Sequence, residues 1–324
     1  MRILVTGGAG YIGGAFLRAA LAAGHSLSVI DNLSTGHADS LPPGVDFRQV
    51  DLRERRWLDP LLAECDALVH FAARSLVAES VADPVGYYRD NLGGFLALLA
   101  GIEAVGGPRR LVFSSSAAVY GHGEGQPFRE TDPCRPVNPY GGTKLAMEQV
   151  LGHAAPRLKL RYLCLRYFNA AGALADHGER HQPETHLIPL ALAAAAGGEP
   201  LTLYGEDYPT PDGSCVRDGV HVADLAEAHL AALAALEAPS DPSGPLNLGT
   251  GQGHSVKAVI ASVERVTGRA VPLRRGPRRP GDPALLVAAV DRARALLGWA
   301  PRQAALDAIV ASAWDFARGG AGGG

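Results

Sequence analysis

Short apolar segments alternate with longer helical ones through the first half of the chain. The strand-like segments are "RILVT", "SLSVID", "ALVHFA", "RRLVFSS" and "RYLCLRYF". Helical segments lie between them, beginning with "YIGGAFLRAALAAG". Strands joined through helices pair in parallel, so this order predicts an α/β fold with a doubly wound, mainly parallel Rossmann sheet. Ligands of such sheets bind at the carboxyl ends of the strands.

The pattern changes after about residue 173, where loops lengthen and prolines cluster, as in "DYPTPDGS" and "RRGPRRPGDP". We predict a Rossmann domain over residues 1–173 and a smaller C-terminal α/β domain, mainly over residues 174–318. Segments near 217–235 are expected to return to the first domain. The glycine-rich residues 319–324 are expected to form a disordered tail.

Composition excludes several classes of protein. Hydrophobic residues make up 47% of the 324 residues, charged residues 19%, and the net charge is -3, so the chain offers no basic field for nucleic acid and no polybasic membrane patch. No apolar run reaches the roughly 18 residues of a membrane span, and "MRILVTGG" is too short for a secretory signal. The scattered cysteines, which lack CxxC spacing, indicate reduced thiols and a cytoplasmic protein: Cys65, Cys134, Cys164 and Cys215.

Three histidines lie close together in "DHGERHQPETH", namely His177, His181 and His186. The segment is polar, contains a proline and has no helical periodicity. No cysteine or carboxylate pattern completes a set of metal ligands. We interpret them as loop histidines and predict no metal site.

A glycine-rich turn, "TGGAGYIGG", joins the first predicted strand to the first predicted helix. Its Gly7, Gly10 and Gly13 form a GxxGxxG pattern. Glycines allow a tight turn and let the backbone approach a pyrophosphate at the helix N-terminus. The next strand ends at Asp31, whose carboxylate can accept both hydrogen bonds of a ribose diol and would repel a 2′-phosphate. A glycine turn alone can serve packing, but this context favours dinucleotide binding, and NAD over NADP.

Tyr140 and Lys144 lie four residues apart in "NPYGGTKLAMEQV", at the start of a predicted helix. Such pairs share a helix face, and many are surface contacts worth only about 0.3–0.5 kcal/mol. Bringing a phenol pKa from about 10 to near 7 takes roughly 4 kcal/mol, so the pair can matter only in a low-dielectric cleft. There, Lys144 and a positively charged nicotinamide would both favour the phenolate. Ser116, at the end of the strand "LVFSSS", would bind the same substrate oxygen and relay its proton.

With these motifs the chain resembles the extended short-chain dehydrogenase/reductase family over almost its whole length. Within that family its motifs are similar to those of UDP-glucose (UDP-galactose) 4-epimerases. The matching stretches are "GGAGYIGG", "DNLSTG", "HFAARSLVAES", "FSSSAAVYG", "PYGGTK", "RYFNAAGA", "PETHLIPL", "YGEDYPTPDGSCVRDGVHVADLA" and "RRPGD". The resemblance implies that Ser116, Tyr140 and Lys144 form the catalytic set.

The resemblance also implies a binding site for NAD. Core packing explains apolar members such as Ile12 and Phe71 equally well, and Ser75 departs from a lysine of some relatives, which puts a cofactor hydroxyl contact there in doubt. The implied cofactor positions are Gly7, Gly10, Tyr11, Ile12, Gly13, Asp31, Asn32, Leu33, Ser34, Thr35, Gly36, Asp51, Leu52, Phe71, Ala72, Ala73, Ser75, Asn91, Tyr140, Lys144 and Phe168.

A UDP-sugar site is implied by further matches. Arginine suits a diphosphate because its planar fork donates two hydrogen bonds and keeps its charge. His186 departs from an asparagine of some relatives but can still donate to UDP. The implied positions are Ser116, Tyr140, Asn169, His186, Leu187, Thr202, Leu203, Tyr204, Arg217, Arg279, Asp282 and Leu286. For Arg279, in the crowded "LRRGPRRPGD", a solvated basic loop is the alternative.

The implied reaction is 4-epimerisation of a UDP-hexose without net redox change. Tyr140 takes the proton of the C4 hydroxyl while C4 gives its hydride to NAD, the 4-keto sugar turns over, and both are returned on the other face. Related dehydratases carry an Asp-Glu pair after the catalytic hydroxyl residue, whereas this chain has Ala117 and Ala118, which cannot serve as acid and base. A net oxidoreductase and a non-catalytic NAD-binding regulator are the less favoured alternatives.

Substrate choice and assembly stay open at this point. Leu286, or its neighbour Leu285, falls where relatives vary between tyrosine and smaller residues, so UDP-N-acetylhexosamines are an alternative substrate. UDP-pentoses are another. The family usually forms homodimers through helices near residues 85–106 and 139–153. The apolar "GFLALLAGIEAV" suits such an interface, although a buried helix would look the same.

Overall fold

A parallel seven-stranded sheet forms the larger lobe of the computed structural model, which describes residues 1–123, 126–279 and 282–321. Its order is β11-β6-β5-β4-β1-β2-β3, and every neighbouring pair runs parallel. The predicted sheet is therefore confirmed. The strands are β1 (Arg2–Thr6), β2 (Ser26–Asp31), β3 (Asp46–Gln49), β4 (Ala67–His70), β5 (Arg110–Ser116), β6 (Arg161–Tyr167) and β11 (Gly244–Leu248).

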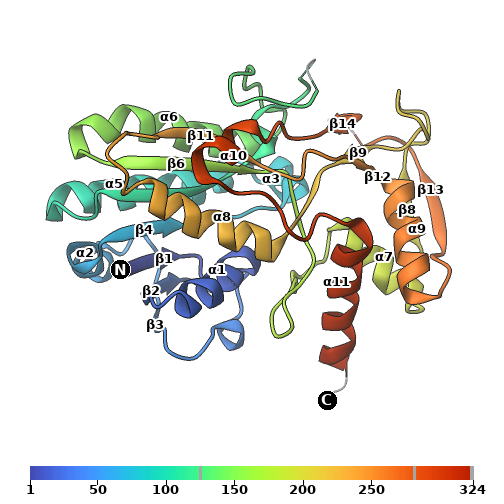
Figure 1. Ribbon diagram of the computed structural model, residues 1–324, viewed down its shortest axis with the longest axis horizontal. Helices are drawn as coiled ribbons and strands as arrows, with labels where there is room; N and C mark the ends of the chain where they lie inside the picture. The colour runs from blue at the N-terminus through green and yellow to red at the C-terminus, as the bar shows by residue number, and fades with distance from the viewer. Residues whose placement is uncertain (124–125, 280–281, 322–324) are drawn as a thin grey trace.

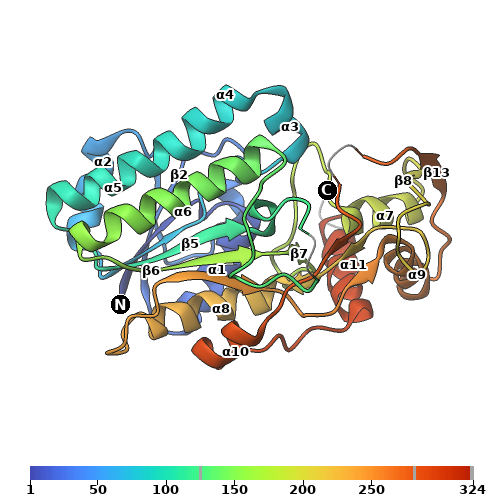
Figure 2. The same cartoon turned by 90° about the horizontal axis from the view of Figure 1, so that it is seen from above.

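Helices cover both faces of this sheet (Figure 2). On one face, helices pack against apolar residues of β1, β2, β6 and β11. These helices are α1 (Tyr11–Ala22), α8 (Val222–Ala235) and α10 (Asp291–Leu297). On the other face, helices pack against β4, β5 and β6. These helices are α2 (Arg55–Glu64), α5 (Gly93–Val105) and α6 (Pro139–Leu158). Both sheet faces are buried, which explains why the strands read as apolar runs rather than as alternating ones.

Short helical segments shape the rim of the sheet at the carboxyl ends of its strands. A π-helical turn, η2, links α4 to α5, so that the segment from residue 84 to 105 is nearly one continuous helix (Figure 2). The short segments are η1 (Ala38–Ser40), α3 (Val77–Ala82), α4 (Pro84–Tyr87), η2 (Tyr88–Leu92) and η3 (Ala117–Val119).

A smaller lobe lies beyond the carboxyl ends of the strands (Figure 1). Its own core joins three helices: α7 (Leu187–Ala195), α9 (Val256–Thr267) and α11 (Leu306–Ala321). Short strands complete it and connect it to the sheet: β7 (Asn169–Ala171) with β10 (Gly219–His221), β8 (Leu201–Tyr204) with β13 (Leu273–Gly276), and β12 (His254–Ser255) with β9 (Val216–Arg217) and β14 (Leu285–Leu286).

The chain returns to the larger lobe after entering the smaller one. β10 pairs with β7, and α8 then packs against α1, in the region near 217–235 where the sequence predicted a return. The return goes further than predicted, because β11 adds a strand to the sheet beside β6. The C-terminal helix α11 continues through Ala321, so residues 319–321 of the predicted tail are helical, while residues 322–324 lie outside the described residues.

Candidate active site

A cleft of about 2080 Å³ opens at the carboxyl ends of the strands and takes lining residues from both lobes. Pockets for one drug-sized ligand are typically about 300–1,000 Å³. The cleft therefore has room for a dinucleotide and a second nucleotide together. Every predicted site residue lines it except Leu33 and Leu203. Leu203 is 3% exposed and packs inside the smaller lobe, so any contact it makes with a ligand would be through its backbone.

The glycine turn brings three backbone segments together at the start of α1. A Cβ atom on Gly13 would lie 2.2 Å from the carbonyl oxygen of Gly7, and one on Gly7 would lie 2.4 Å from the backbone nitrogen of Ala72. Gly7 also has a φ of +75°, which favours glycine. This close packing leaves the backbone N–H groups at the helix N-terminus facing the cleft. The cradle fits a pyrophosphate.

Asp31 stands at the end of β2 and fixes the two loops beside it. Its Oδ2 accepts a hydrogen bond from the N–H of Ala9 at 3.0 Å, and its Oδ1 accepts one from the N–H of Leu33 at 2.8 Å. Burial raises the pKa of this carboxyl, and these backbone bonds oppose the rise. Each carboxylate oxygen keeps further acceptor capacity for a ribose hydroxyl. Leu33 thus serves the site through its N–H, with a φ of +58°.

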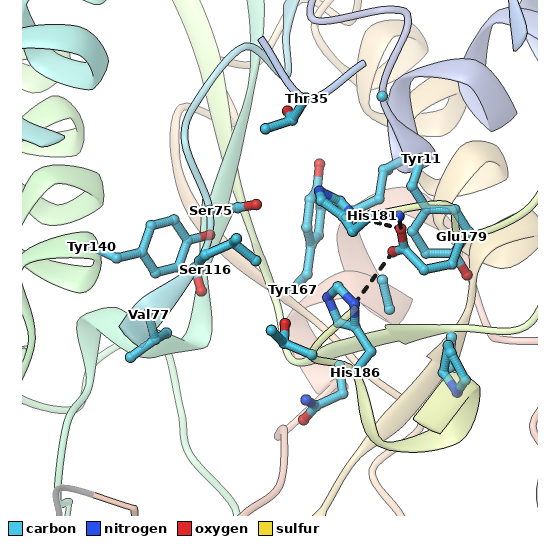
Figure 3. Close-up of a pocket in the computed structure, with 18 of the residues that line it drawn as sticks. Tyr11, Thr35, Ser75, Val77, Ser116, Tyr140, Tyr167, Glu179, His181 and His186 are labelled. Carbon is cyan, nitrogen blue, oxygen red and sulfur yellow. Dashed lines mark hydrogen bonds and ion pairs between the residues drawn. The ribbon is translucent and has the colours of Figure 1, made fainter. Parts of the chain in front are cut away.

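Asn91 holds the loop that carries Ser75. Its Oδ1 accepts a hydrogen bond from the N–H of Arg74 at 2.8 Å, and its Nδ2 donates to the Arg74 carbonyl at 3.0 Å and to Thr143 Oγ1 at 3.1 Å. Because Thr143 precedes Lys144 on α6, this amide links the loop of Ser75 to that helix. The hydroxyl of Ser75 lies on the same side of the cleft as Ser116 and Tyr140 (Figure 3).

Ser116 and Tyr140 lie next to each other in the cleft, where the end of β5 faces the start of α6 (Figure 3). Asn138 caps α6 by accepting a hydrogen bond from the N–H of Gly141 at 2.8 Å, and Pro139 follows as the first helical residue. These local signals fix where the helix begins and hence where the phenol points. Burial raises the pKa of Tyr140, and a hydrogen bond with Ser116 opposes this rise.

Lys144 points at the strand rather than directly at the phenol. Its Nζ donates to the carbonyl oxygen of Ser114 at 2.7 Å and lies 5.9 Å from the centre of the Tyr140 ring. Burial lowers the pKa of Lys144 to about 7, and the charge of Glu148 opposes the decrease. The lysine is only 2% exposed, which confirms the low-dielectric setting that the sequence argument required. The protein without its ligands nevertheless favours the neutral phenol.

The other half of the cleft carries the predicted anchors for a diphosphate. Arg217 on β9 pairs with Asp282 and donates to the Val216 carbonyl at 2.8 Å. Arg279 lies with its guanidinium carbon 4.0 Å from the centre of the Tyr204 ring, a cation–π arrangement that fixes the side chain. Leu286 pairs in register with Arg217 on the neighbouring strand. Leu286 lines the cleft, whereas Leu285 is not among its lining residues.

The histidine loop takes a more prominent place than the sequence predicted. His177 is a packing residue, because its Nε2 bonds the carbonyl oxygen of Tyr11 at 2.7 Å and the ring lies 3% exposed. His181 and His186, by contrast, line the cleft and flank the carboxylate of Glu179 (Figure 3). Burial would lower the pKa of His186, but its hydrogen bond with Glu184 at 2.7 Å and the charge of Glu179 outweigh it and raise that pKa.

Ligand atoms of Glu179, His181 and His186 all lie within 4.8 Å of one another. In the part of the chain that the structure describes, no other such group of histidine, cysteine and carboxylate side chains occurs. Both histidines already bond carboxylates through Nδ1, so a metal could be bound only through Nε2 without breaking those bonds. The absence of a metal site therefore stays a prediction.

Sequence reasoning missed several residues that line the cleft, among them Tyr167, Glu179 and Arg74. Tyr167 ends β6 and was interpreted only as part of a strand. Glu179 lies in a loop whose orientation depends on the distant contact between His177 and Tyr11. The one available signal was the position of Tyr167 at a strand end, where Rossmann sheets place their ligand contacts.

Together, the parallel sheet, the glycine cradle with its acidic strand end and the Ser–Tyr–Lys set define a nicotinamide-dependent enzyme of the short-chain dehydrogenase/reductase type. The model of the NAD dependent epimerase/dehydratase family matches residues 3–249. The chain belongs to this family.

Individual relatives are similar to the chain over nearly its full length. The UDP-glucose 4-epimerase of Lacticaseibacillus casei is 45% identical over 98% of this chain and 96% of its own. The crystal structure of UDP-glucose 4-epimerase from Brucella ovis in complex with NAD is 43% identical, with a TM-score of 0.91 and 97% of each chain covered. That from Bifidobacterium longum, in complex with NAD+ and UDP, is 33% identical with a TM-score of 0.92 and covers 100% of each chain.

Proposed function

We propose that the protein interconverts UDP-galactose and UDP-glucose by inverting the configuration at C4 of the sugar, a step of galactose metabolism. The observation that carries this proposal is that Ser116 and Tyr140, which lie next to each other (Figure 3), line the same cleft as the glycine cradle and the two arginines Arg217 and Arg279. A sugar held there by its UDP has its hydroxyls within reach of a proton-transfer pair. The relatives named above, which are UDP-glucose 4-epimerases, support the choice of substrate.

Different residues of the cleft carry out proton transfer, supply positive charge and bind the diphosphate. NAD, when bound in the cradle, supplies a reversible acceptor for the hydride of C4. Tyr140 accepts the proton of the C4 hydroxyl and later returns it, and Ser116 binds the same oxygen and relays the proton. Lys144, which is 2% exposed, adds positive charge beside the phenol in a site of low dielectric. Arg217 and Arg279 hold the diphosphate, while the large cleft leaves the 4-keto sugar free to turn over.

Elimination of water is disfavoured by the residues that follow Ser116. Ala117 is 1% exposed and Ala118 also lines the cleft, so two methyl groups stand where a dehydratase needs an acid and a base. Neither group can take or donate a proton. Epimerisation, which needs only the single proton relay of Tyr140 and Ser116, fits this arrangement.

The experiment that tests the proposal uses purified protein and UDP-galactose without added nucleotide. Chromatography of the sugar nucleotides over time should show a mixture of UDP-galactose and UDP-glucose. Conversion only after NAD is added would retain the chemistry and show that the cofactor is lost on purification. No conversion in either case would reject the hexose epimerase.

Leu286 favours a second candidate substrate class, the UDP-N-acetylhexosamines. The side chain is half-buried beside a cluster containing Phe168 and lines the cleft on the strand paired with that of Arg217. Leucine leaves more room than tyrosine for an N-acetyl group.

We expect Leu286→Tyr to lower the rate on UDP-N-acetylgalactosamine at least about tenfold, because a steric clash of about 1.4 kcal/mol changes a rate by that factor. The rate on UDP-galactose serves as the control, and equal N-acetyl rates for both proteins would contradict the idea. UDP-pentoses are tested in the same assay.

We also propose a homodimer formed through α4–α5 and α6, acting in the cytoplasm. The two long helices run side by side on one face of the sheet (Figure 2). Val85 is 77% exposed and Leu96 is 45% exposed on this side, and neither lines the cleft. Light scattering on a sizing column should give a dimer for the parent and a monomer for Val85→Glu, since a charge in an apolar interface lacks a partner. A parent that elutes as a monomer would contradict the proposal.

Among the described residues, no helix is long and apolar enough to cross a bilayer.

A further inference from the structure

A buried ion pair lies directly behind the catalytic residues and outside the cleft. Arg166 on β6 donates to Glu148 on α6 through Nε at 3.0 Å and through Nη2 at 2.6 Å. The two side chains are 5% and 8% exposed. Burying two charges costs desolvation energy, so such a pair is by itself weak evidence for a role in stability. Its contacts point to a different role.

The first contact joins Glu148 on α6 to the strand β5. Tyr140, Lys144 and Glu148 occupy positions i, i+4 and i+8 and therefore lie on one side of the helix. Glu148 accepts a hydrogen bond from the hydroxyl of Ser115, and Lys144 donates to the carbonyl of the adjacent Ser114 at 2.7 Å.

The next residue of the strand is Ser116, which lies beside the phenol of Tyr140 (Figure 3). Three consecutive residues of β5 thus face three successive turns of α6, and hydrogen bonds tie the first two of them to the helix. Because β5 ends at Ser116, these ties decide how far the strand end stands from the helix. Of the three helix residues, only Glu148 does not line the cleft.

Arg166 is held from its other side as well. Its Nη1 donates to the hydroxyl of Tyr120 at 2.9 Å, and that hydroxyl donates to Asn247 Oδ1 at 2.7 Å. Asn247 belongs to β11, so the pair is anchored to the outermost strand of the sheet. The carboxylate of Glu148 consequently has little freedom to move.

The charge of the pair reaches Lys144. Burial lowers the pKa of Lys144 to about 7, and the carboxylate of Glu148 opposes that decrease. The other titratable groups that face Lys144 are His70 on β4, whose own pKa the lysine helps to lower, and Tyr140. The charged or titratable groups that face Glu148 are Lys144, Arg166, Cys134, Tyr162 and Cys164.

We propose that Glu148 is a positioning residue for the proton-transfer set: its carboxylate fixes the end of β5 through Ser115 and, paired with Arg166, places a negative charge one helical turn from Lys144. The proposal rests on the proposed function in assigning the reaction that this arrangement serves. The charge relation itself is independent of the reaction and can be measured without turnover.

The decisive experiment compares two single variants that break the same ion pair from opposite ends. Glu148→Gln removes the negative charge and leaves Arg166, so the pH at which kcat falls on the alkaline side should move down by roughly one unit. Arg166→Gln leaves the carboxylate and should move that pH up. If the pair is only structural, both variants lose stability and neither shows these opposite shifts. Shifts of the same sign, or none, in active variants would overturn the proposal.

Further variants separate the effect of the hydrogen bond between Ser115 and Glu148 from the effect of the negative charge of Glu148. Ser115→Ala should lower kcat with little change in KM and no shift of the pH profile, because it removes the hydroxyl and no charge. The double variant Glu148→Gln with Arg166→Gln should return the alkaline pH toward that of the parent. Glu103→Gln is the matched control, because Glu103 on α5 forms an exposed ion pair with Arg157 near the end of α6. This variant should change neither kcat nor the pH profile.

A measurement without turnover keeps the proposal testable if the protein does not epimerise UDP-galactose. The sequence contains three lysines, Lys144, Lys159 and Lys257. Only a neutral amine undergoes reductive methylation, so the rate at each lysine as a function of pH, read by mass spectrometry, gives its protonation. The inflection for Lys144 should move in opposite directions in the two single variants while the other lysines stay fixed. A Lys144 that is unreactive at every pH, or whose inflection does not move, would overturn the inference without bearing on the reaction.

Discussion

Tyr140 is the residue on which the proposed chemistry depends most directly. Its phenol reaches the cleft where Ser116 and the end of β5 meet α6, and burial raises its pKa. The protein alone therefore keeps the proton on the phenol. Positive charge from Lys144, whose Nζ lies 5.9 Å from the ring centre, and from the bound cofactor must offset that burial.

Replacing Tyr140 with phenylalanine tests this assignment. We expect Tyr140→Phe to lower kcat by about 10²–10⁴-fold with KM changed only slightly, because proton transfer is lost and sugar binding is retained. The measurement is the rate of UDP-galactose conversion with saturating NAD. Tyr162→Phe is the matched control, because Tyr162 does not line the cleft. Comparable losses in both variants would indicate a general effect on folding instead.

Single residues were predictable where a motif fixed their position in the fold. Asp31, Ser116 and Tyr140 all stand at ends of elements that the local pattern defines, and all line the cleft. Glu179 and Glu148 were not predicted, for physical reasons. The orientation of a loop residue and the burial of a helix carboxylate both depend on contacts with residues far away in the sequence, such as Tyr11 and Arg166.

At the scale of elements, the turn between β1 and α1 has the strictest steric requirement. Gly13 lies in the first turn of α1, and its Cα approaches the carbonyl of Gly7 so closely that a methyl group does not fit. Backbone must move to admit one, and the N–H groups of the cradle move with it. The turn therefore couples a packing constraint to the binding of a phosphate.

We expect Gly13→Ala to abolish retention of NAD through a desalting column, read as absorbance of cofactor released on denaturation. The reason is the 2.2 Å approach to the Gly7 carbonyl oxygen. Gly93→Ala provides the contrast, because a Cβ on Gly93, at the start of α5, meets nothing within 4 Å. That variant should keep its NAD and gain about 0.5–1 kcal/mol of unfolding free energy. Normal retention by Gly13→Ala would contradict the assigned cradle.

Elements with a strong local pattern were predicted from the sequence, and those without one were not. The long helices follow apolar periodicity, and the five inner strands are short apolar runs. Strand β3 is a short edge strand with the sequence "DFRQ", and α2 contains Pro60, which disfavours a helix, so neither carries a clear signal. Strand β11, "GPLNL", contains a glycine and a proline, and its partner β6 lies far upstream in the chain. Such long-range pairing leaves no mark in a local window.

At the scale of the whole molecule, two buried histidines make folding sensitive to acid. His70 lies between the rings of Phe95 and Phe113, and His229 lies against Phe71 and bonds Tyr167. Burial lowers the pKa of His70 to about 3 and that of His229 to about 4. Both are below the unfolded value of about 6.5, so the unfolded chain takes up protons first as the pH falls.

Stability from these histidines is therefore present above pH 6.5 and is lost progressively as the pH falls toward 4. At pH 5 each one lowers the unfolding free energy by about 2 kcal/mol relative to pH 7. Denaturant titrations at the two pH values should show that His70→Phe removes its share of the difference, whereas His153→Asn, at an exposed position of α6, leaves the difference intact. An unchanged pH difference in His70→Phe would contradict this account.

The late position of β11 in the chain matters for biosynthesis. Gly244 pairs with Leu163, so a nascent chain has already made β6 when about 80 residues still separate it from its outer neighbour. During that interval the edge of β6 presents unpaired N–H and C=O groups, a template for association with other chains. Part of the smaller lobe, including α7, is translated in the same interval, whereas its other two core helices, α9 and α11, follow β11. A gene fragment that ends before β11 would therefore yield an open-edged sheet prone to aggregation.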